Sequence, residues 1–305
     1  MTPIHRIAVI QLHPKPLQLD FNYSKAEKFI RSAASQGAEL AVLPEYHLTN
    51  WIPDDPGFKP ACAHWKKYLD KYRALAKECK ISIVPGTIVE LHTDDVHDRT
   101  GLAEGEREGE RLLNVAYFIG PDGEILGKYV KKNLWGAIER NHLTSSTHDP
   151  HPVFDTPIGK VGILVCWDLA FPEAFRELIA RGAKTIIIPT FWTLSDCSKL
   201  GLAHNPVAEK LFLDSALTTR CFENTCAIVF SNAGGPPGKG YCGVSQVCAP
   251  YVGPIVRLGD CTEGMAVAEL DMALVEDAEA NYQVRADLAK VDWHYDYRHS
   301  GDPKL

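Results

Sequence analysis

A cysteine at position 166 stands where an apolar segment gives way to a helical pattern, in the run GILVCWDLAFPE at residues 162–173. Residues 160–165 are mostly apolar with several β-branched side chains, which predicts a buried strand. Residues 172–179 predict a helix with Pro172 in its first turn. Backbone N–H groups and a helix dipole at such a corner favour a thiolate and a developing oxyanion. Cys166 is therefore a candidate nucleophile, with a buried structural cysteine as the alternative.

Two charged residues also follow predicted strands. Glu45 ends the apolar run AVLPE at residues 41–45, where open α/β sheets place their ligand groups. Lys131 lies in the strand-like run GKYVKKNLW at residues 127–135. Each residue alone is typical of a solvated surface, but Glu, Lys and Cys in this order at three strand ends are a more specific pattern. Together they could supply a general base, an oxyanion donor and a nucleophile.

These three segments resemble the Glu–Lys–Cys triad motifs of the nitrilase superfamily, the carbon–nitrogen hydrolases. The similarity covers roughly residues 5 to 290. Further segments resemble family signatures: residues 138–140, 216–224, 231–232, 243–246 and 285–288. The resemblance implies that Glu139 is the family's second, supporting glutamate, whereas an ordinary surface pair of Glu139 with Arg140 is the alternative.

The chemistry of an amide or nitrile carbon suggests a role for each residue, because such a poor electrophile is hydrolysed more easily in two steps through a covalent intermediate. Cys166 would attack the carbon as a thiolate. Glu45 would take the thiol proton, return it to the departing amine and then deprotonate water. Lys131 and the Trp167 backbone N–H would donate to the tetrahedral oxyanion.

Substrate class follows less directly from the sequence. Asp168 stands after Cys-Trp, where nitrilases usually carry Glu, so the chain looks more like amidases and carbamoyl-amide hydrolases. Four tryptophans fall in or beside strand-end loops, where they could wall an apolar substrate pocket or belong to the core: Trp51, Trp135, Trp167 and Trp192. We expect hydrolysis of a small amide or N-carbamoyl compound. A nitrile hydrolase and a catalytically silent binding protein are the alternatives.

The whole chain limits the classes of protein. Its 305 residues are 45% hydrophobic and carry a net charge of −7 with both signs interspersed, which fits one large core and argues against a nucleic-acid surface. No segment is typical of a transmembrane helix or a signal peptide, so we expect no membrane partner. Nine cysteines without a regular framework favour reduced thiols in the cytoplasm.

No metal or cofactor is expected. The sequence has no Cys-x-x-Cys or His-x-x-x-His pair. The glycine-rich run GGPPGKG at residues 234–240 differs from a phosphate loop in its spacing, its two prolines and the residue after its lysine.

The order of predicted elements indicates the fold. Residues 7–45 and 161–190 each read as a strand–helix–strand unit with a Gly-Ala turn after the helix and a proline closing the second strand. Further strands are expected at 81–86, 112–119 and 225–231 and near 244 and 266, with an exposed loop at 91–111. Two such sheets with helices outside predict an α/β protein, a four-layer α-β-β-α sandwich over residues 1–290.

The last part of the chain and one helix suggest self-association. Residues 291–305 form an aromatic and charged tail, which we expect to be an interface arm rather than a frayed end. The predicted helix at 208–220 has more apolar positions than one covered face needs, including Leu211 and Phe212. Because relatives pair such helices across a two-fold axis, the resemblance implies a homodimer or a higher homo-oligomer.

Overall fold

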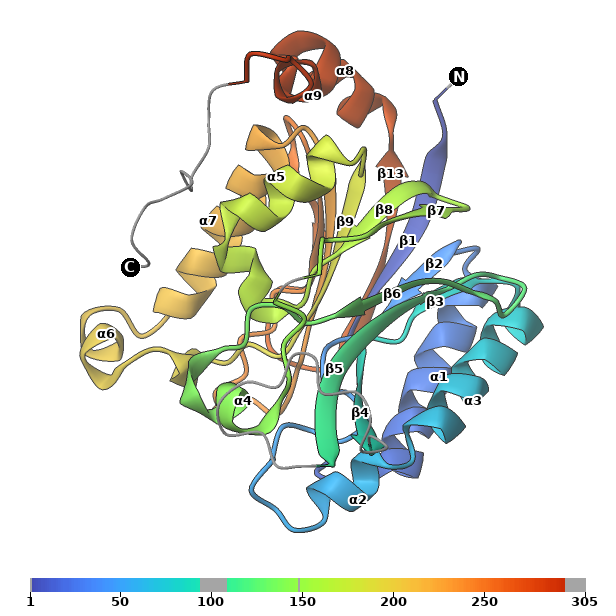
Figure 1. Ribbon diagram of the computed structural model, residues 1–305, viewed down its shortest axis with the longest axis vertical. Coiled ribbons are helices and arrows are strands. Elements are labelled where there is room, and N and C mark those ends of the chain that lie inside the picture. Colours follow the sequence, from blue (N-terminus) through green and yellow to red (C-terminus); the bar gives the residue numbers. More distant parts are fainter. Residues whose placement is uncertain (1, 94–108, 148, 294–305) are drawn as a thin grey trace.

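Two β-sheets pack face to face, and helices cover the outer face of each, which gives four layers in the order α-β-β-α (Figure 1). The computed structural model describes residues 2–93, 109–147 and 149–293. The expected sandwich is confirmed.

The first sheet has seven strands in the order β13-β1-β2-β3-β5-β4, with β6 also pairing with β5. Strands β1, β2 and β3 are parallel to one another, and the other pairings in this sheet are antiparallel. The bounds are β1 Ile4–Gln11, β2 Leu40–Val42, β3 Ser82–Val84, β4 Thr87–Thr93, β5 Glu110–Ile119, β6 Ile125–Val130 and β13 Gly264–Asp271.

The second sheet has six strands in the order β12-β11-β10-β9-β8-β7. Its central strands β8, β9 and β10 are parallel. The bounds are β7 Val153–Thr156, β8 Gly159–Ile163, β9 Thr185–Thr190, β10 Ala227–Asn232, β11 Gln246–Ala249 and β12 Gly253–Arg257.

Two long helices cover each sheet (Figure 1). Helices α1 (Leu19–Ser35) and α3 (Trp65–Cys79) lie on the first sheet, and α5 (Pro172–Ala180) and α7 (Ala208–Glu223) lie on the second. The other helices are α2 Phe58–Cys62, α4 Gly136–His142, α6 Lys199–His204, α8 Ala273–Tyr282 and α9 Val284–Leu288, with 3₁₀ turns at Cys166–Ala170 and Leu194–Asp196.

Strand β1 shows how the sequence pattern builds the layers. Its residues are apolar on both faces because both faces are covered. Ile7 and Val9 belong to the core cluster that contains residues of both sheets, whereas Ala8 and Ile10 belong to the cluster beneath α1 and α3. The two-residue period of a strand therefore divides one apolar run between two cores.

Several elements differ from the expectation. The predicted exposed loop at 91–111 is partly strand, because β4 extends to Thr93 and β5 begins at Glu110, and the two pair along their length. Residues 94–108 lie outside the described residues, as do residues 294–305 of the tail. Helices α2 and α3 were not predicted, nor were β7 and β12.

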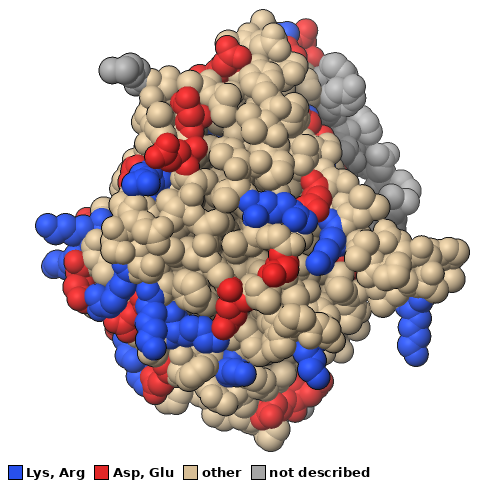
Figure 2. Space-filling model, turned by 180° about the vertical axis from the view of Figure 1, so that it is seen from behind, with Lys and Arg blue, Asp and Glu red and all other residues tan. Residues whose placement is uncertain are grey.

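Charges of both signs are mixed on the face that Figure 2 shows, including the lower left, where α1 and α3 lie. Arg31 of α1 contacts Glu27 at 2.7 Å and Glu78 of α3 at 2.8 Å. Such exposed pairs contribute little to stability because water screens them. Within the described ranges, no helix is long and apolar enough to cross a membrane.

Candidate active site

The three predicted strand-end residues meet between the sheets. Glu45 follows β2, Lys131 follows β6 directly, and Cys166 begins the 3₁₀ turn after β8. The Lys131 Nζ atom lies 2.9 Å from Glu45 Oε1. The backbone of Phe191, just after β9, contacts both the base and the nucleophile: its N–H donates to Glu45 Oε2 at 2.9 Å, and its carbonyl accepts from Cys166 Sγ at 3.9 Å.

Glu45 has the environment of a general base that works near neutral pH. Its side chain is fully buried, and its backbone N–H donates to the Thr190 carbonyl at 3.3 Å. Burial raises the pKa of Glu45 to about 7, with a further upward contribution from Glu139, against the opposing pull of Lys131. A carboxylate with this pKa can both accept and return a proton at physiological pH.

A close backbone approach fixes the position of Glu45. Gly86, between β3 and β4, has a positive φ of 60°. A Cβ atom there would lie 1.8 Å from the Pro44 carbonyl oxygen, so only glycine fits beside the residue that precedes the base.

Cys166 is held in an unusual backbone conformation. Its φ is +50°, in the left-handed region that costs a non-glycine residue energy and often occurs at functional sites. Burial, followed by the Glu45 carboxylate, raises the pKa of the Cys166 thiol well above its ordinary value. Desolvation and the nearby carboxylate therefore outweigh the local dipoles that favour a thiolate, and the thiol needs a base when it attacks, which is the role expected of Glu45.

Lys131 is a fully buried cation between two carboxylates. Burial alone would lower the pKa of its ammonium, but Glu139 and Glu45 raise it well above the ordinary value, so the group is charged. Two of its three N–H groups point to Glu139 Oε1 at 2.7 Å and Glu45 Oε1 at 2.9 Å. Within the part of the chain that the structure describes, the third has no acceptor and could donate to an oxyanion.

Glu139, on α4, is buried and fully engaged. Its Oε1 accepts from Lys131 and from the Tyr46 hydroxyl, each at 2.7 Å, and its Oε2 accepts from the Trp135 backbone N–H at 2.7 Å. A carboxylate that is 4% exposed does not fit the alternative of a surface pair with Arg140.

Tyr46 and Asn114 also contact this cluster and were not predicted. Asn114, in the middle of β5, donates to Glu45 Oε1 at 2.8 Å. Both residues are buried polar groups. Asn114 could have been recognised from the sequence as an asparagine in the apolar part of a predicted strand, because a buried polar side chain needs a specific hydrogen-bond partner.

Comparisons with known proteins identify the family. The family model described as carbon-nitrogen hydrolase matches residues 6–280. The chain belongs to the carbon-nitrogen hydrolase family. It is 30% identical over 281 residues to a protein named nitrilase from Pyrococcus abyssi, covering 90% of this chain and 93% of the relative. It is 26% identical over 303 residues to omega-amidase NIT2 of Homo sapiens, covering 94% and 97%.

A solved structure shares the fold of this carbon-nitrogen hydrolase. The nitrilase-superfamily amidase of Nesterenkonia AN1 superposes with a TM-score of 0.69 at 24% sequence identity. The match covers 93% of this chain and 98% of that one. The described sandwich therefore has the same fold as that amidase.

The four tryptophans of the hydrolase lie at different places around the site. Trp51 stacks on Tyr46 with ring centres 4.6 Å apart. Trp135 supplies a backbone N–H to Glu139. Trp167 and Trp192 pack together at 5.4 Å, but Trp192 is only 3% exposed and its indole N–H donates to Glu209. Trp192 therefore lies in the core, packed against Trp167.

Asp168 shapes the nucleophile turn from within the protein. Its fully buried carboxylate accepts from the Val165 N–H at 2.9 Å, the Tyr129 hydroxyl at 2.8 Å and the Asn133 backbone N–H at 2.9 Å. These bonds connect the segment before Cys166 to the chain just after Lys131. The aspartate at position 168 therefore reflects how the turn packs, not a contact with substrate.

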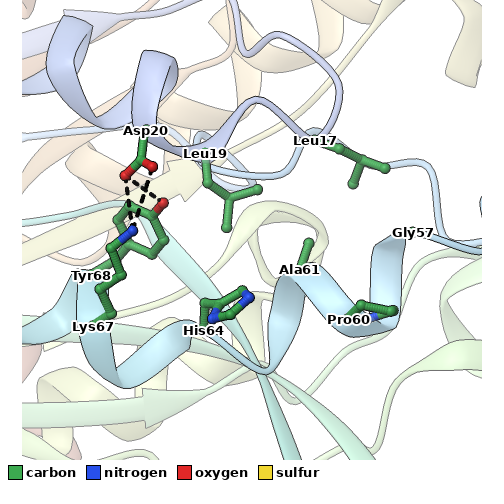
Figure 3. Close-up of a pocket in the computed structure, with 9 residues that line it drawn as sticks. All are labelled: Leu17, Leu19, Asp20, Gly57, Pro60, Ala61, His64, Lys67 and Tyr68. Atoms are coloured by element: carbon green, nitrogen blue, oxygen red, sulfur yellow. Dashed lines mark hydrogen bonds and ion pairs between the residues drawn. The ribbon is translucent and has the colours of Figure 1, made fainter.

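A surface hollow lies elsewhere, between the start of α1 and helices α2 and α3 (Figure 3). Asp20 at one end accepts from the Tyr68 hydroxyl at 2.8 Å and from Lys67 at 3.1 Å. The residues that line it include no cysteine, and its only carboxylate is already paired. It therefore does not form part of the candidate active site.

Proposed function

We propose that this carbon-nitrogen hydrolase cleaves a small non-peptide amide or N-carbamoyl compound through a thioester on Cys166. The observation that carries the proposal is a base with a pKa of about 7 buried beside a nucleophilic thiol and a charged lysine. The kinship with a relative named omega-amidase supports amide hydrolysis.

In the first step, Cys166 Sγ bonds to the carbonyl carbon while its proton passes to Glu45. The former carbonyl oxygen becomes an oxyanion, which the third Lys131 N–H and the Trp167 backbone N–H stabilise. Glu45 then returns the proton to the nitrogen as the C–N bond breaks. Ammonia or an amine leaves, and the thioester remains.

In the second step, Glu45 takes a proton from water as the water oxygen attacks the thioester carbon. The same two donors stabilise the second oxyanion. The C–S bond breaks, Cys166 regains a proton from Glu45, and a carboxylic or carbamic acid is released.

Nitrile hydrolysis is the second candidate, supported by the relative named nitrilase. Here Cys166 would add to the nitrile carbon to give a thioimidate. Water would add next, ammonia would leave, and the reaction would join the same thioester path. The two candidates differ in the first bond to be broken, not in the residues required.

A panel of matched substrates separates these candidates. Ammonia and amine release would be measured for a short aliphatic amide, an N-carbamoyl amine and the nitrile of the same carbon skeleton. Hydrolysis of the amide or carbamoyl compound, absent in Cys166→Ala, supports the proposal. Hydrolysis of the nitrile alone supports the second candidate. Equal rates with and without Cys166 would contradict both.

We also propose that the enzyme works as a homodimer or larger homo-oligomer in the cytoplasm. The outer face of α7 carries Leu211 at 60% exposure and Phe212 at 38%, and Leu200 of the neighbouring α6 is 70% exposed. An apolar surface of this kind favours a partner copy. All nine cysteines are unpaired, which fits a reducing compartment. The tail at 291–305 remains a proposed interface arm, and only its first three residues are described.

A further inference from the structure

A closed ring of hydrogen bonds joins the two carboxylates on either side of Lys131. The Lys131 ammonium donates to Glu45 Oε1 at 2.9 Å and to Glu139 Oε1 at 2.7 Å. Asn114 Nδ2 donates to Glu45 Oε1 at 2.8 Å and to the Tyr46 hydroxyl at 3.0 Å. The Tyr46 hydroxyl closes the ring by donating to Glu139 Oε1 at 2.7 Å.

The protons of this ring have one consistent arrangement when both carboxylates are ionised. The Asn114 amide has two N–H bonds, one for Glu45 and one for Tyr46. The single Tyr46 proton is then left for Glu139, which can only accept. The Lys131 ammonium donates two of its three N–H groups to the carboxylates. Because its nitrogen is tetrahedral, these two bonds fix the direction of the third N–H.

We propose that Asn114 and Tyr46 are positioning residues of this hydrolase, which hold Glu45 and Glu139 as hydrogen-bond acceptors and so aim the free N–H of Lys131. The inference rests on the proposed function for its kinetic consequences. In the proposed mechanism neither residue bonds to the substrate. Asn114 acts through Glu45, and Tyr46 acts through Glu139 and through its ring, whose centre lies 6.0 Å from the Lys131 ammonium.

The proposal has a consequence for protonation. Lys131, Glu139 and Cys166 are the titratable groups that act on Glu45, and Tyr46 lies next to them. A donor to the ionised carboxylate lowers its pKa, so loss of the Asn114 amide raises the pKa of Glu45. Loss of the Tyr46 hydroxyl removes one donor from Glu139 Oε1, the same oxygen that accepts from Lys131, and so loosens the hold of that carboxylate on the ammonium.

Tyr46 can be tested by removal of one atom. Its ring stacks on Trp51 with centres 4.6 Å apart and meets Phe191 at 6.0 Å, so Tyr46→Phe keeps the packing and removes only the hydroxyl. Tyr117→Phe, on β5, is a matched control. The buried Tyr117 also donates its hydroxyl to a fully buried carboxylate, that of Glu90, outside the active site.

The experiment measures alkylation of Cys166 by iodoacetamide as a function of pH, followed by mass analysis of the Cys166 peptide. Wild type, Asn114→Leu, Tyr46→Phe and Tyr117→Phe are compared, and melting temperatures report on folding. Alkylation requires thiol deprotonation but no substrate. The kcat and KM values for an amide substrate are measured in parallel.

On the acid side, the alkylation rate should fall to half its plateau value at a certain pH, the midpoint. We expect this midpoint to rise by roughly 0.5 to 1 pH unit in Asn114→Leu, because a hydrogen bond to the ionised Glu45 carboxylate is lost. Tyr46→Phe should show a kcat lower by about tenfold with KM little changed. Tyr117→Phe should keep the wild-type profile even if its melting temperature falls.

An unshifted midpoint in folded Asn114→Leu, or a Tyr46→Phe variant that matches Tyr117→Phe in kcat, would overturn the proposal. The alkylation result does not depend on the proposed function. If no amide, carbamoyl compound or nitrile is turned over but the Asn114→Leu midpoint rises as expected, the ring stands and the proposed reaction is wrong.

Discussion

The Lys131 ammonium lies 2.7 Å from Glu139 Oε1, closer than the 2.9 Å that separates it from Glu45 Oε1. One buried cation therefore faces two buried carboxylates. Burial mainly raises the pKa of Glu45 to about 7, Lys131 opposes this rise, and the negative charge of Glu139 adds to it. A second buried carboxylate can in this way tune the pKa of the first.

Removal of the charge on Glu139 should lower the pKa of Glu45, since the Glu139 carboxylate is one of the groups that raise it. In Glu139→Gln, the acid limb of kcat/KM should therefore move to lower pH. Turnover should also fall by at least about tenfold as Lys131 loses its closest partner. Steady-state kinetics across pH tests this, with Glu90→Gln as a control at another buried carboxylate. If the acid limb of the Glu139→Gln profile stays at the wild-type pH or moves to higher pH, the prediction is contradicted.

The wild-type enzyme should lose activity in acid. Below a pH of about 7, Glu45 is protonated and cannot accept the thiol proton. In that range kcat/KM should fall about tenfold per pH unit. Because the pKa of the Cys166 thiol is raised, the plateau should extend beyond the ordinary cysteine pKa of about 8.5. A bell-shaped profile centred in acid, with circular dichroism showing an intact fold, would contradict these assignments.

The base and the oxyanion donor should each be essential. Glu45→Gln keeps the shape of the side chain but cannot accept a proton, and Lys131→Met keeps its length without any N–H donor. Each should lower kcat by at least about 100-fold. Lys128→Met, three residues earlier on β6 and exposed, should change kcat little. Activity of Lys131→Met within about tenfold of wild type would remove Lys131 from the mechanism.

The outer face of α7 should mediate dimer formation. Leu211→Asp places a charge on a 60% exposed apolar position, whereas Phe21→Asp does the same at a 51% exposed position on α1, in the opposite layer. Light scattering at micromolar concentration should give twice the chain mass of 33.8 kDa for wild type and for Phe21→Asp. The Leu211→Asp variant should shift towards the monomer and lose activity. A fully active wild-type monomer would refute the proposal.

The sequence predicted the elements whose pattern is local. Residues 161–166 and 185–190 are continuous apolar runs beside glycine and proline, and they form β8 with its following turn and β9. The catalytic candidates were identified because each ends such a run. Helix α3 was missed although Tyr68, Leu69, Tyr72, Leu75 and Ala76 follow helical spacing with one buried face.

What the sequence could not supply was the three-dimensional cluster around those candidates. Asn114 reaches Glu45 across 69 positions of sequence, and the Phe191 N–H reaches it across 146. The raised pKa of the Cys166 thiol could not be predicted either, because local dipoles can be inferred from sequence whereas burial and a distant carboxylate cannot.

The central claim is covalent catalysis by Cys166, and acid quenching during turnover tests it most directly. Intact-mass and peptide analysis of enzyme stopped within the first turnovers of an amide substrate should find the acyl group on Cys166. The same treatment of Cys166→Ala should find no adduct and no turnover. Full turnover without any adduct, together with Cys166→Ala activity within about tenfold of wild type, would contradict the account.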